Sequence, residues 1–315
     1  MHAPASSTTY VDFNRAAWSG LRANTPLTLT ETELNDLRGI NEPVALDEVA
    51  GIYLPLSRLL NLRIAASQHL ADATTAFLGT LAPKAPFIIG LAGSVAVGKS
   101  TISRVMCSLL RRWPNHPNVE LITTDGFLHP NAWLEERDLM SRKGFPESYD
   151  LGRLIAFLTE LKSGAPEVRA PVYSHVVYDV VPDAEIIVRQ PDIVVVEGLN
   201  VLQVAALRDE ADALPFVSDF FDFSIYVDAD VVDIKRWYIE RFLALRAAAF
   251  TDDNSFFHHF ARLSDDHATA VAVSIWDSIN GVNLAENIAP TRSRADLVLE
   301  KGPDHSVQRV RLRRQ

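Results

Sequence analysis

Hydrophobic residues occur along this chain in two alternating patterns. Short apolar runs rich in β-branched residues have the length of buried strands. They occupy residues 87–91, 119–124, 192–198 and 221–227. Between them, apolar residues recur three and four positions apart, as in amphipathic helices. These helices are predicted over residues 99–110, 132–140, 150–161 and 231–249. Strands that alternate with helices are typical of a mostly parallel sheet with helices on both faces. We therefore predict a three-layer α/β fold.

The chain before residue 85 shows helical patterns instead of this alternation. Residues 11–23 have apolar positions at helical spacing and predict a short helix. Thr30 and Glu33 match a capping box, which predicts that a second helix begins near Glu31.

A longer helical stretch follows over residues 46–78, and we expect Pro55 to shorten or kink it. Residues 79–86 contain two prolines and are typical of a linker. We therefore expect residues 1–84 to be a tail and a helical extension that packs on a core formed by residues 85–315. The first nine residues are small and polar, and we expect them to be disordered.

Two internal segments have different patterns. Residues 168–189 alternate and are rich in Val, Tyr and Pro, which predicts a small antiparallel excursion. Residues 141–149 form a polar loop that is either a solvated connection or a mobile substrate flap. The residue pattern favours neither interpretation of this loop.

The last fifty residues are predicted to return to the core. A helix is expected over residues 265–279, a loop over 280–293, and closing strands over 295–300 and 307–312. Arg309, Arg311 and Arg313 alternate with apolar residues in the last segment. This pattern predicts an edge strand with one solvated face.

The first apolar run leads into a glycine-rich motif. Residues 93–100 match G-x-x-x-x-G-K-S/T at each defined position, between a predicted strand and a predicted helix. Backbone N–H groups of such a loop surround phosphates, and the helix N-terminus adds positive potential. We expect ATP contacts from Gly93, Ser94, Val95, Ala96, Val97, Gly98, Lys99, Ser100 and Thr101. Lys99 is expected to reach the β- and γ-phosphates, and Ser100 to hold Mg²⁺. The motif does not identify the phosphate acceptor.

Two acidic residues lie at the carboxyl ends of predicted strands, where ligands bind in parallel sheets. Asp125 is either a general base that orients an acceptor hydroxyl or the side chain of an Asx-turn before Gly126. Glu197 is either a magnesium carboxylate or an N-cap at the strand end. We favour the functional interpretation of both residues.

Other candidates depend on weaker local patterns. His175 lies in the predicted antiparallel excursion, and a lone histidine is more often structural than ligand-binding. Tyr238 and Arg241 are about one turn apart on a predicted helix and share a face. Arg241 either neutralises charge on a transferred phosphoryl group or forms a surface ion pair, and its position does not decide between these.

Composition limits the class of function. The chain has 315 residues and a formal net charge of −10. This charge argues against a general nucleic-acid-binding protein, because such proteins need a basic face. Cys107 is the single cysteine, so no disulfide can form within the chain, and we expect it to be buried. The first ten residues do not resemble a signal peptide, and no apolar run has the length needed to cross a bilayer. We therefore expect a cytoplasmic protein.

Several segments together resemble the bacterial type I pantothenate kinases. They are Gly-Ser-Val-Ala-Val-Gly-Lys-Ser-Thr (93–101), Thr-Thr-Asp-Gly-Phe-Leu-His-Pro-Asn (123–131), Arg-Lys-Gly-Phe-Pro-Glu-Ser-Tyr-Asp (142–150), Ala-Pro-Val-Tyr-Ser-His (170–175), Glu-Gly-Leu-Asn-Val-Leu-Gln (197–203) and Asn-Ile-Ala-Pro-Thr-Arg-Ser-Arg-Ala (287–295). The glycine-rich motif alone is shared by many NTPases, whereas the combination is specific. The resemblance extends from about residue 10 to residue 313.

This resemblance implies a P-loop kinase that uses ATP to phosphorylate pantothenate to 4′-phosphopantothenate, the first step of coenzyme A biosynthesis. It implies catalytic roles for Lys99, for Asp125 as the acceptor-side carboxylate, and for Arg241, which steadies the transferred phosphoryl group. Positions that hold pantothenate are matched by Tyr173, His175, Tyr238 and Asn280, and the adenine end of the nucleotide site by Asn41, Lys301 and His305. A helical region at about residues 238–285 is expected to cover the substrate.

The resemblance also implies a homodimer and feedback inhibition by coenzyme A. Lys99, Arg104 and His175 match positions that contact the inhibitor. Leu245 departs from the family, because some members carry an aromatic residue there, against the pantetheine pocket.

Two other functions are compatible with the individual motifs, when their combination is not considered. A related kinase that acts on uridine or phosphoribulose would use the same core. A nucleotide-dependent switch protein would hydrolyse ATP slowly and would need no acceptor pocket. The dependence of ADP release on an acceptor distinguishes these possibilities.

Overall fold

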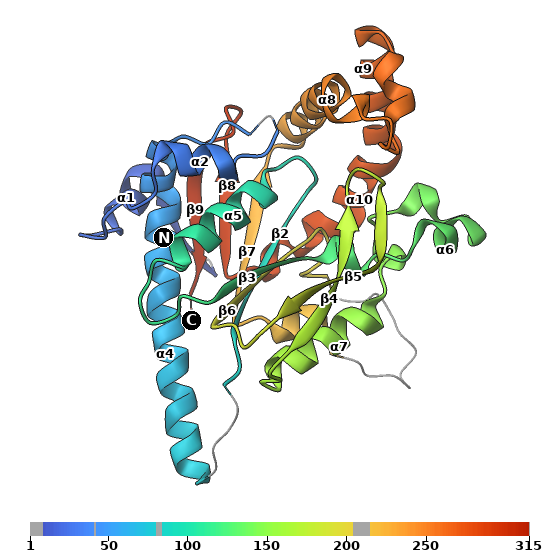
Figure 1. Cartoon of the computed structure of the whole chain (residues 1–315). Coiled ribbons are helices and arrows are strands. Elements are labelled where there is room, and N and C mark those ends of the chain that lie inside the picture. Colours follow the sequence, from blue (N-terminus) through green and yellow to red (C-terminus); the bar gives the residue numbers. More distant parts are fainter. Residues whose placement is uncertain (1–8, 41, 80–83, 204–214, 315) are drawn as a thin grey trace, which may run out of the picture.

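A seven-stranded sheet forms the centre of the computed structural model, which describes residues 9–40, 42–79, 84–203 and 215–314. The strand order is β1-β9-β8-β7-β2-β6-β3 (Figure 1). The strands are β1 (Tyr10–Asn14), β2 (Phe87–Gly93), β3 (Val119–Thr123), β6 (Ile193–Glu197), β7 (Phe223–Ala229), β8 (Leu297–Lys301) and β9 (Val307–Arg313). Strands β8, β7, β2, β6 and β3 are parallel, whereas β9 and β1 pair antiparallel. The predicted mostly parallel α/β sheet is confirmed.

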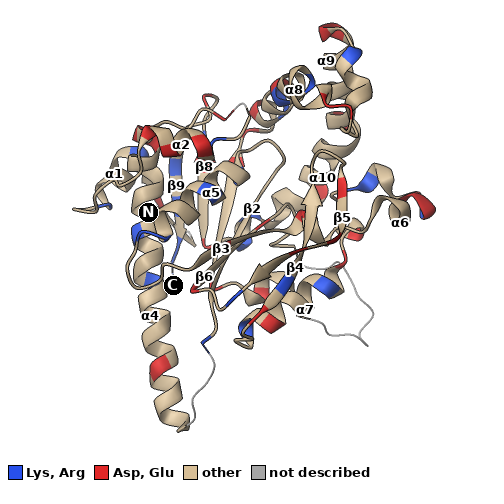
Figure 2. Cartoon of the chain, in the orientation of Figure 1, with Lys and Arg blue, Asp and Glu red and all other residues tan. Residues whose placement is uncertain are grey.

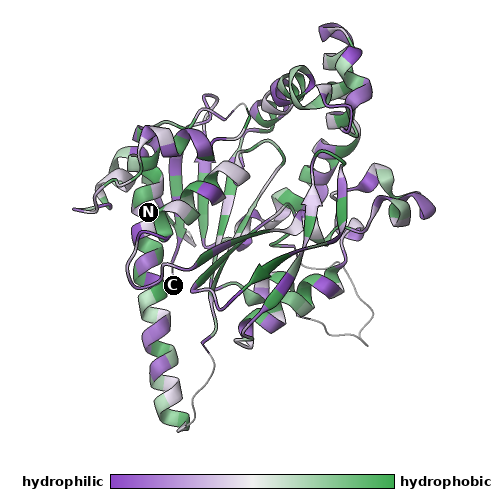
Figure 3. Ribbon diagram, in the orientation of Figure 1, coloured by the Kyte–Doolittle hydropathy of each residue, from purple (hydrophilic) through white to green (hydrophobic). Residues whose placement is uncertain are grey.

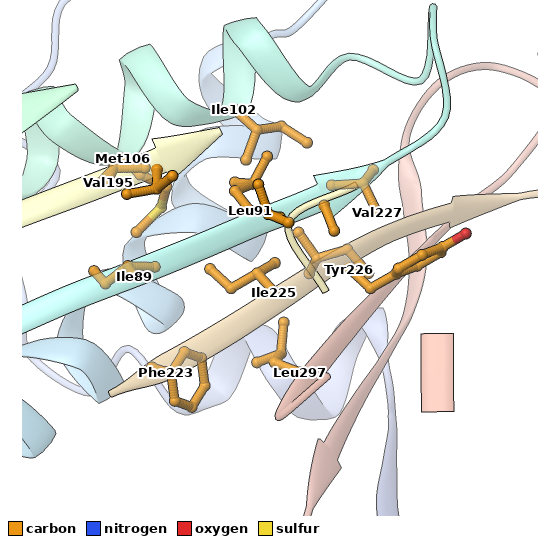
Figure 4. Close-up of a cluster of buried hydrophobic side chains, with 14 of the residues drawn as sticks. Ile89, Leu91, Ile102, Met106, Val195, Phe223, Ile225, Tyr226, Val227 and Leu297 are labelled. Carbon is orange, nitrogen blue, oxygen red and sulfur yellow. The ribbon is translucent and has the colours of Figure 1, made fainter. Parts of the chain in front are cut away.

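The parallel strands are the most deeply buried part of the chain. Every residue of β2 and β6 is buried, as expected for parallel strands that are covered on both faces. Figure 4 shows side chains from these strands packed together with Ile102 and Met106 of helix α5. The hydropathy colouring of Figure 3 shows the same central strands as largely hydrophobic. The sheet therefore provides a rigid base for the loops at its strand ends.

The helices connect these strands and extend the fold at its N-terminal side. They are α1 (Arg15–Gly20), α2 (Glu31–Leu37), α3 (Leu46–Glu48), α4 (Leu54–Leu78), α5 (Lys99–Leu110), α6 (Asn131–Glu136), α7 (Leu151–Lys162), α8 (Val231–Ala247), α9 (Asp265–Ile275) and α10 (Gly281–Asn283). Both hydrogen bonds of the predicted capping box are present: the Thr30 side chain accepts from the Glu33 N–H, and the Glu33 carboxylate accepts from the Thr30 N–H. Pro55 does not end the long helical stretch, because a π-helical turn precedes it and the Leu54 N–H bonds the Val49 carbonyl.

The N-terminal prediction over residues 11–23 was wrong in its first part. The chain there forms strand β1, and α1 begins only after Asn14, whose side chain caps it. Strand β1 pairs with β9, so β9, which we predicted as an edge strand, lies inside the sheet and β1 is the edge. Arg311 of β9 donates to Asp12 of β1 at 2.8 Å, between residues 299 positions apart. A local pattern cannot indicate a partner at that distance along the chain.

The predicted loop over residues 280–293 is also wrong, because this segment is helical. A π-helical turn at Trp276–Asn280 leads through α10 into a second π-helical turn at Leu284–Ile288 and a 3₁₀ turn at Ala289–Arg294. Leu284 and Ile288, four positions apart, bury their side chains in the core. Between these two apolar positions lie Glu286 and Asn287, so the segment lacks the continuous amphipathic pattern from which a helix is predicted.

The predicted antiparallel excursion is present as a separate two-stranded sheet, β4 (Val168–Ser174) and β5 (Asp179–Val188). The loop over residues 141–149 is not the solvated connection that was one of its two interpretations. Its Lys143, Phe145, Ser148 and Tyr149 are buried. The other interpretation, a mobile flap, stays a prediction.

Some predictions fall on residues that the structure does not describe. These are most of the expected tail (residues 1–8), part of the expected linker (residues 80–83) and Asn41. Among the described residues, no helix combines the length and the apolar character that crossing a membrane would require.

Candidate active site

The glycine-rich motif forms a tight loop between β2 and α5. Gly93 and Gly98 have φ angles of +147° and +94°, which favour glycine. A Cβ atom on Gly93 would lie 2.6 Å from the Val227 carbonyl oxygen, so the close approach of β7 also excludes a side chain. Helix α5 begins at Lys99 and directs its N-terminal N–H groups into the loop. Within the described residues, the buried hydroxyl of Ser94 has no hydrogen-bond partner, which suits a donor that faces a phosphate.

Lys99 is the central charged group of this loop. Its side chain is 9% exposed, and its Nζ donates to the Ser94 carbonyl at 2.7 Å. Burial lowers the pKa of Lys99, while the carboxylates of Glu197 and Asp125 oppose this shift and the Arg241 guanidinium adds to it. Lys99 therefore interacts electrostatically with Glu197, Asp125 and Arg241, so the fold brings these four charged side chains close together.

Ser100 and Glu197 are in direct contact at the ends of α5 and β6. The Ser100 hydroxyl donates to one carboxylate oxygen of Glu197 at 2.7 Å, and the Ser103 hydroxyl donates to the other at 2.9 Å. Glu197 is thus not the helix N-cap that we considered as its alternative role. A hydroxyl and a carboxylate are oxygen ligands of the kind that Mg²⁺ prefers. Among the described residues there is no group of three or more His, Cys, Asp and Glu that could hold a metal, so phosphates and water would have to complete such a site.

Asp125 lies in a 3₁₀ turn, Thr124–Phe127, immediately after β3. The backbone carbonyl of Asp125, rather than its carboxylate, accepts the Leu128 N–H that closes the turn. A Cβ atom on Gly126 would lie 2.2 Å from the Pro171 carbonyl, so this turn packs directly against β4. The contact brings the carboxylate to the aromatic residues of the two-stranded sheet.

Three tyrosines lie close enough to Asp125 for its charge to act on them. The Asp125 carboxylate contributes to raised pKa values at Tyr149, Tyr173 and Tyr178, although burial is the main cause for each. The rings of Tyr173 and Tyr178 are 6.3 Å apart and nearly perpendicular. Burial also raises the pKa of Tyr238, to about 12, and the nearby side chain of Asn280 opposes this shift. These neutral hydroxyl and amide groups can donate to and accept from a polar acceptor molecule.

Arg241 and His175 lie at the border of this tyrosine cluster. Arg241 forms no ion pair with another residue in the described part of the chain, contrary to one of its two interpretations. Its charge acts instead on Lys99 and on Tyr238, one turn earlier on α8. His175 is exposed near the tip of the two-stranded sheet, and its ring is 5.2 Å from that of Tyr173.

Lys143 is a charged residue of this region for which the sequence suggested no role. It is 8% exposed, and its Nζ donates to Asn131 Oδ1 at 2.6 Å and to the Tyr178 carbonyl at 2.5 Å. The same ammonium lies 4.1 Å from the centre of the Tyr178 ring. Burial lowers the pKa of Lys143 to about 8, against the carboxylates of Asp179 and Asp125. Its motif, residues 142–150, was the only sequence signal that could have identified it.

The expected adenine end lies on the other side of the phosphate loop. Lys301 at the end of β8 donates to the Val97 carbonyl at 3.0 Å and is 8% exposed. His305 stacks on the buried Trp237, with 4.0 Å between the ring centroids, and burial lowers its pKa to about 4. Arg104, an expected inhibitor contact, donates to the Leu37 carbonyl at 2.8 Å and to the Thr101 hydroxyl at 3.2 Å.

Comparison with known sequences identifies close relatives of this chain. The model of the phosphoribulokinase / uridine kinase family matches residues 88–248. A pantothenate kinase of Brevibacillus brevis is 59% identical, over 100% of this chain and 98% of that protein. A pantothenate kinase of Sorangium cellulosum is 60% identical, over 98% of each chain. These matches include the phosphate loop, the Asp125 turn and the tyrosine cluster.

Solved structures share the fold at much lower identity. The D-glycerate 3-kinase of Cryptococcus neoformans superimposes with a TM-score of 0.55 at 13% identity, over 80% of this chain and 97% of that protein. Such a similarity shows the fold alone, and it does not indicate the acceptor.

Proposed function

Since this chain belongs to the pantothenate kinases of the phosphoribulokinase and uridine kinase family, we propose that it phosphorylates pantothenate with ATP. The product is 4′-phosphopantothenate, and the reaction is the first step of coenzyme A biosynthesis. The observation that carries this proposal is identity of about 60% over nearly the whole chain, together with a tyrosine-lined region next to the phosphate loop.

In the proposed mechanism, Asp125 aligns the primary hydroxyl of pantothenate and accepts its proton. Lys99 and Arg241 neutralise the charge that develops on the transferred phosphoryl group. The transition state of phosphoryl transfer is loose, so an ordinary carboxylate is a sufficient proton acceptor. Ser100 and Glu197 would hold Mg²⁺, which when bound neutralises charge on the β- and γ-phosphates.

Polar groups of the tyrosine cluster are proposed to hold pantothenate. Tyr173, Tyr238 and Asn280 would supply half-buried hydroxyl and amide groups, and His175 would supply an imidazole at the exposed border. Such a site would orient the acceptor and exclude water, which favours transfer to the alcohol over hydrolysis.

An acceptor-dependence assay tests this function. ADP release is measured with pantothenate, uridine or ribulose 5-phosphate as the acceptor, and only pantothenate should stimulate it. Stimulation by another acceptor would assign the protein to a different kinase activity. Slow ATP hydrolysis that no acceptor stimulates would indicate a nucleotide-dependent switch protein instead.

Coenzyme A is proposed as a feedback inhibitor that overlaps the phosphate loop. Lys99, Arg104 and His175 are its proposed contacts, and Leu245 packs on a small aromatic cluster next to the tyrosines. Because Lys99 cannot serve both ligands at once, inhibition should be competitive with ATP. Inhibition that does not change with the ATP concentration would contradict the overlap.

The N-terminal extension, residues 1–84, is proposed to mediate a homodimer in the cytoplasm, with residues 85–315 as the catalytic part. Helix α4 runs beyond the sheet in Figure 1, and Figure 2 shows few charges along it. None of the residues of α4 after Ile64 is buried, and Leu70 and Phe77 are 69% and 88% exposed. Light scattering should therefore give a dimer for the wild type and a monomer for Leu70→Glu. A monomeric wild type would refute the dimer.

A further inference from the structure

Four side-chain amides, which we call the amide relay, meet at the backbone carbonyl of Gly144 and have no role in the mechanism above. Gln203 donates to Asn287 at 3.1 Å, and Asn287 donates to Asn283 at 3.0 Å. Asn283 then donates to the Gly144 carbonyl at 2.9 Å. Asn200 donates to the same carbonyl at 2.8 Å. The amide relay therefore joins the segments that follow β6 and α10 to the loop that contains Gly144.

The Gly144 carbonyl sets the direction of the hydrogen bonds in the relay, because a carbonyl oxygen can only accept. The Nδ2 group of Asn283 must face Gly144, which leaves its Oδ1 atom to accept from Asn287. Asn283 is 4% exposed, so water competes little for these groups. Asn283 is therefore a buried amide with a defined orientation, and it fastens the loop to α10.

The loop that Asn283 fastens carries a charged group next to Asp125. Lys143 directly precedes Gly144, and the charge of Asp125 acts on its buried ammonium. At the other end of the loop, the Asp150 N–H donates at 2.8 Å to the carbonyl of Phe127, two residues after Asp125. The loop is thus attached to the Asp125 turn at one end and to the amide relay at the other.

The helical segment that contains Asn283 also carries Asn280, which is proposed to hold pantothenate. Both residues belong to one continuous segment, because the π-helical turn that ends at Asn280 leads directly into α10. The inference rests on the proposed use of pantothenate as the acceptor. We propose that Asn283 is a positioning residue of the acceptor site, which fixes the segment of Asn280 against the loop of Lys143 through the Gly144 carbonyl.

Asn283→Asp tests this proposal with little change of shape. A carboxylate still accepts from Asn287, but it cannot donate to the Gly144 carbonyl. In the coupled ADP assay, the KM of pantothenate should rise roughly threefold to thirtyfold, a usual effect of one lost hydrogen bond. The KM of ATP should stay as in the wild type, because the relay ends on the acceptor-side loop and not on the phosphate loop. A purely structural role would reduce the number of active molecules, which lowers kcat and leaves both KM values unchanged.

Hydrogen–deuterium exchange in the absence of ligands measures the attachment of the loop itself. The Gly144 N–H donates to Ser148 Oγ at 2.9 Å, and the Phe145 N–H donates to the Arg142 carbonyl at 2.9 Å. Without the hydrogen bond from Asn283 the loop should open more often, so both N–H groups should exchange faster in Asn283→Asp than in the wild type. Asn283→Ala removes the donor without adding a charge, and it should change the KM of pantothenate and the exchange rates in the same directions.

Asn118→Asp is the matched control. The Asn118 amide also donates to two backbone carbonyls, that of Arg189 at 3.0 Å and that of Gln190 at 3.1 Å. Asn118 directly precedes β3, at the opposite end of this strand from Asp125. Asn118→Asp should therefore leave the KM of pantothenate and the exchange in the loop as they are in the wild type.

An unchanged KM of pantothenate in Asn283→Asp would overturn the proposal, and so would an equal change in the KM of ATP. Exchange of the loop at the wild-type rate would overturn it as well. A wild type in which pantothenate does not stimulate ADP release would contradict the proposed function, and the exchange rates would then still decide whether Asn283 holds the loop. Far-ultraviolet circular dichroism confirms that the variants are folded.

Discussion

Replacement of Lys143 by methionine should change how the stability of this protein depends on pH. Burial lowers the pKa of Lys143 from 10.5 to about 8. Between these values the unfolded chain binds a proton that the folded chain does not, so the free energy of unfolding of the wild type rises with pH. For pKa values of about 8 and 10.5, the rise from about pH 7.5 to about pH 9.5 is about 2 kcal/mol.

The groups around this ammonium are the Asn131 amide oxygen, the Tyr178 carbonyl and ring, the Tyr173 ring, and the carboxylates of Asp179 and Asp125. Methionine removes the titrating group and leaves two acceptors without this donor. The part of this loss that depends on the charge of Lys143 is already contained in its lowered pKa. The remaining part is the same at every pH, so it cancels when the difference between wild type and variant is compared at two pH values.

Urea denaturation at about pH 7.5 and about pH 9.5 measures this difference. The wild type should gain about 2 kcal/mol relative to Lys143→Met as the pH rises. Lys235→Met, which removes a lysine whose ion pair with Asp277 is on the surface, is the control for a general effect of charge. Parallel pH profiles of the wild type and Lys143→Met would refute the argument that burial depresses the pKa of this lysine.

Four further substitutions or treatments have defined outcomes. Asp125→Ala should lower turnover about 10²–10⁴-fold in a coupled ADP assay, and near-normal turnover would remove the carboxylate from the chemistry. Gly198→Ala should lower stability by about 1–3 kcal/mol in thermal unfolding, because its Cβ atom would lie 2.0 Å from Thr124 Oγ1; an unchanged melting temperature would show that the strand ends can separate. Cys107, whose pKa burial raises to about 12, should resist alkylation until the protein is unfolded, as mass spectrometry can measure; rapid labelling of the folded protein would contradict its burial. Thr30→Ala should cost about 1 kcal/mol through loss of the capping box, and equal denaturation midpoints would exclude this contribution.

The parts of the fold and site that the sequence predicted are those encoded locally. The phosphate loop has its strand, its glycines and its helix within twenty residues, so one window contains the whole motif. Glu197 ends β6 and Asp125 lies two residues after β3, and the parallel pairing of these strands brings both ends to one edge of the sheet. The assignment of a role to the tyrosines, by contrast, depended on resemblance to a family.

What the sequence did not predict depends on contacts between distant segments. Strand β1 is extended because β9 offers it a hydrogen-bonding partner, and the local helical spacing of residues 11–23 gave no sign of that. Lys143 and Glu42 look like ordinary charged residues of polar loops, and only tertiary packing buries the Lys143 ammonium and one Glu42 oxygen. Isolated charges carry no periodic signal, so their burial cannot be recognised before the fold is known.

The pairing of β1 with β9 has a consequence for biosynthesis on the ribosome. Residues 10–14 emerge early, yet their hydrogen-bonding partner in residues 307–313 is translated after every other strand of the sheet. Lys301 and His305, beside the phosphate loop, also arrive late. Until then the nascent polypeptide presents an open β7 edge, the kind of unpaired edge that can pair wrongly with other chains, and its phosphate loop lacks the contact with Lys301.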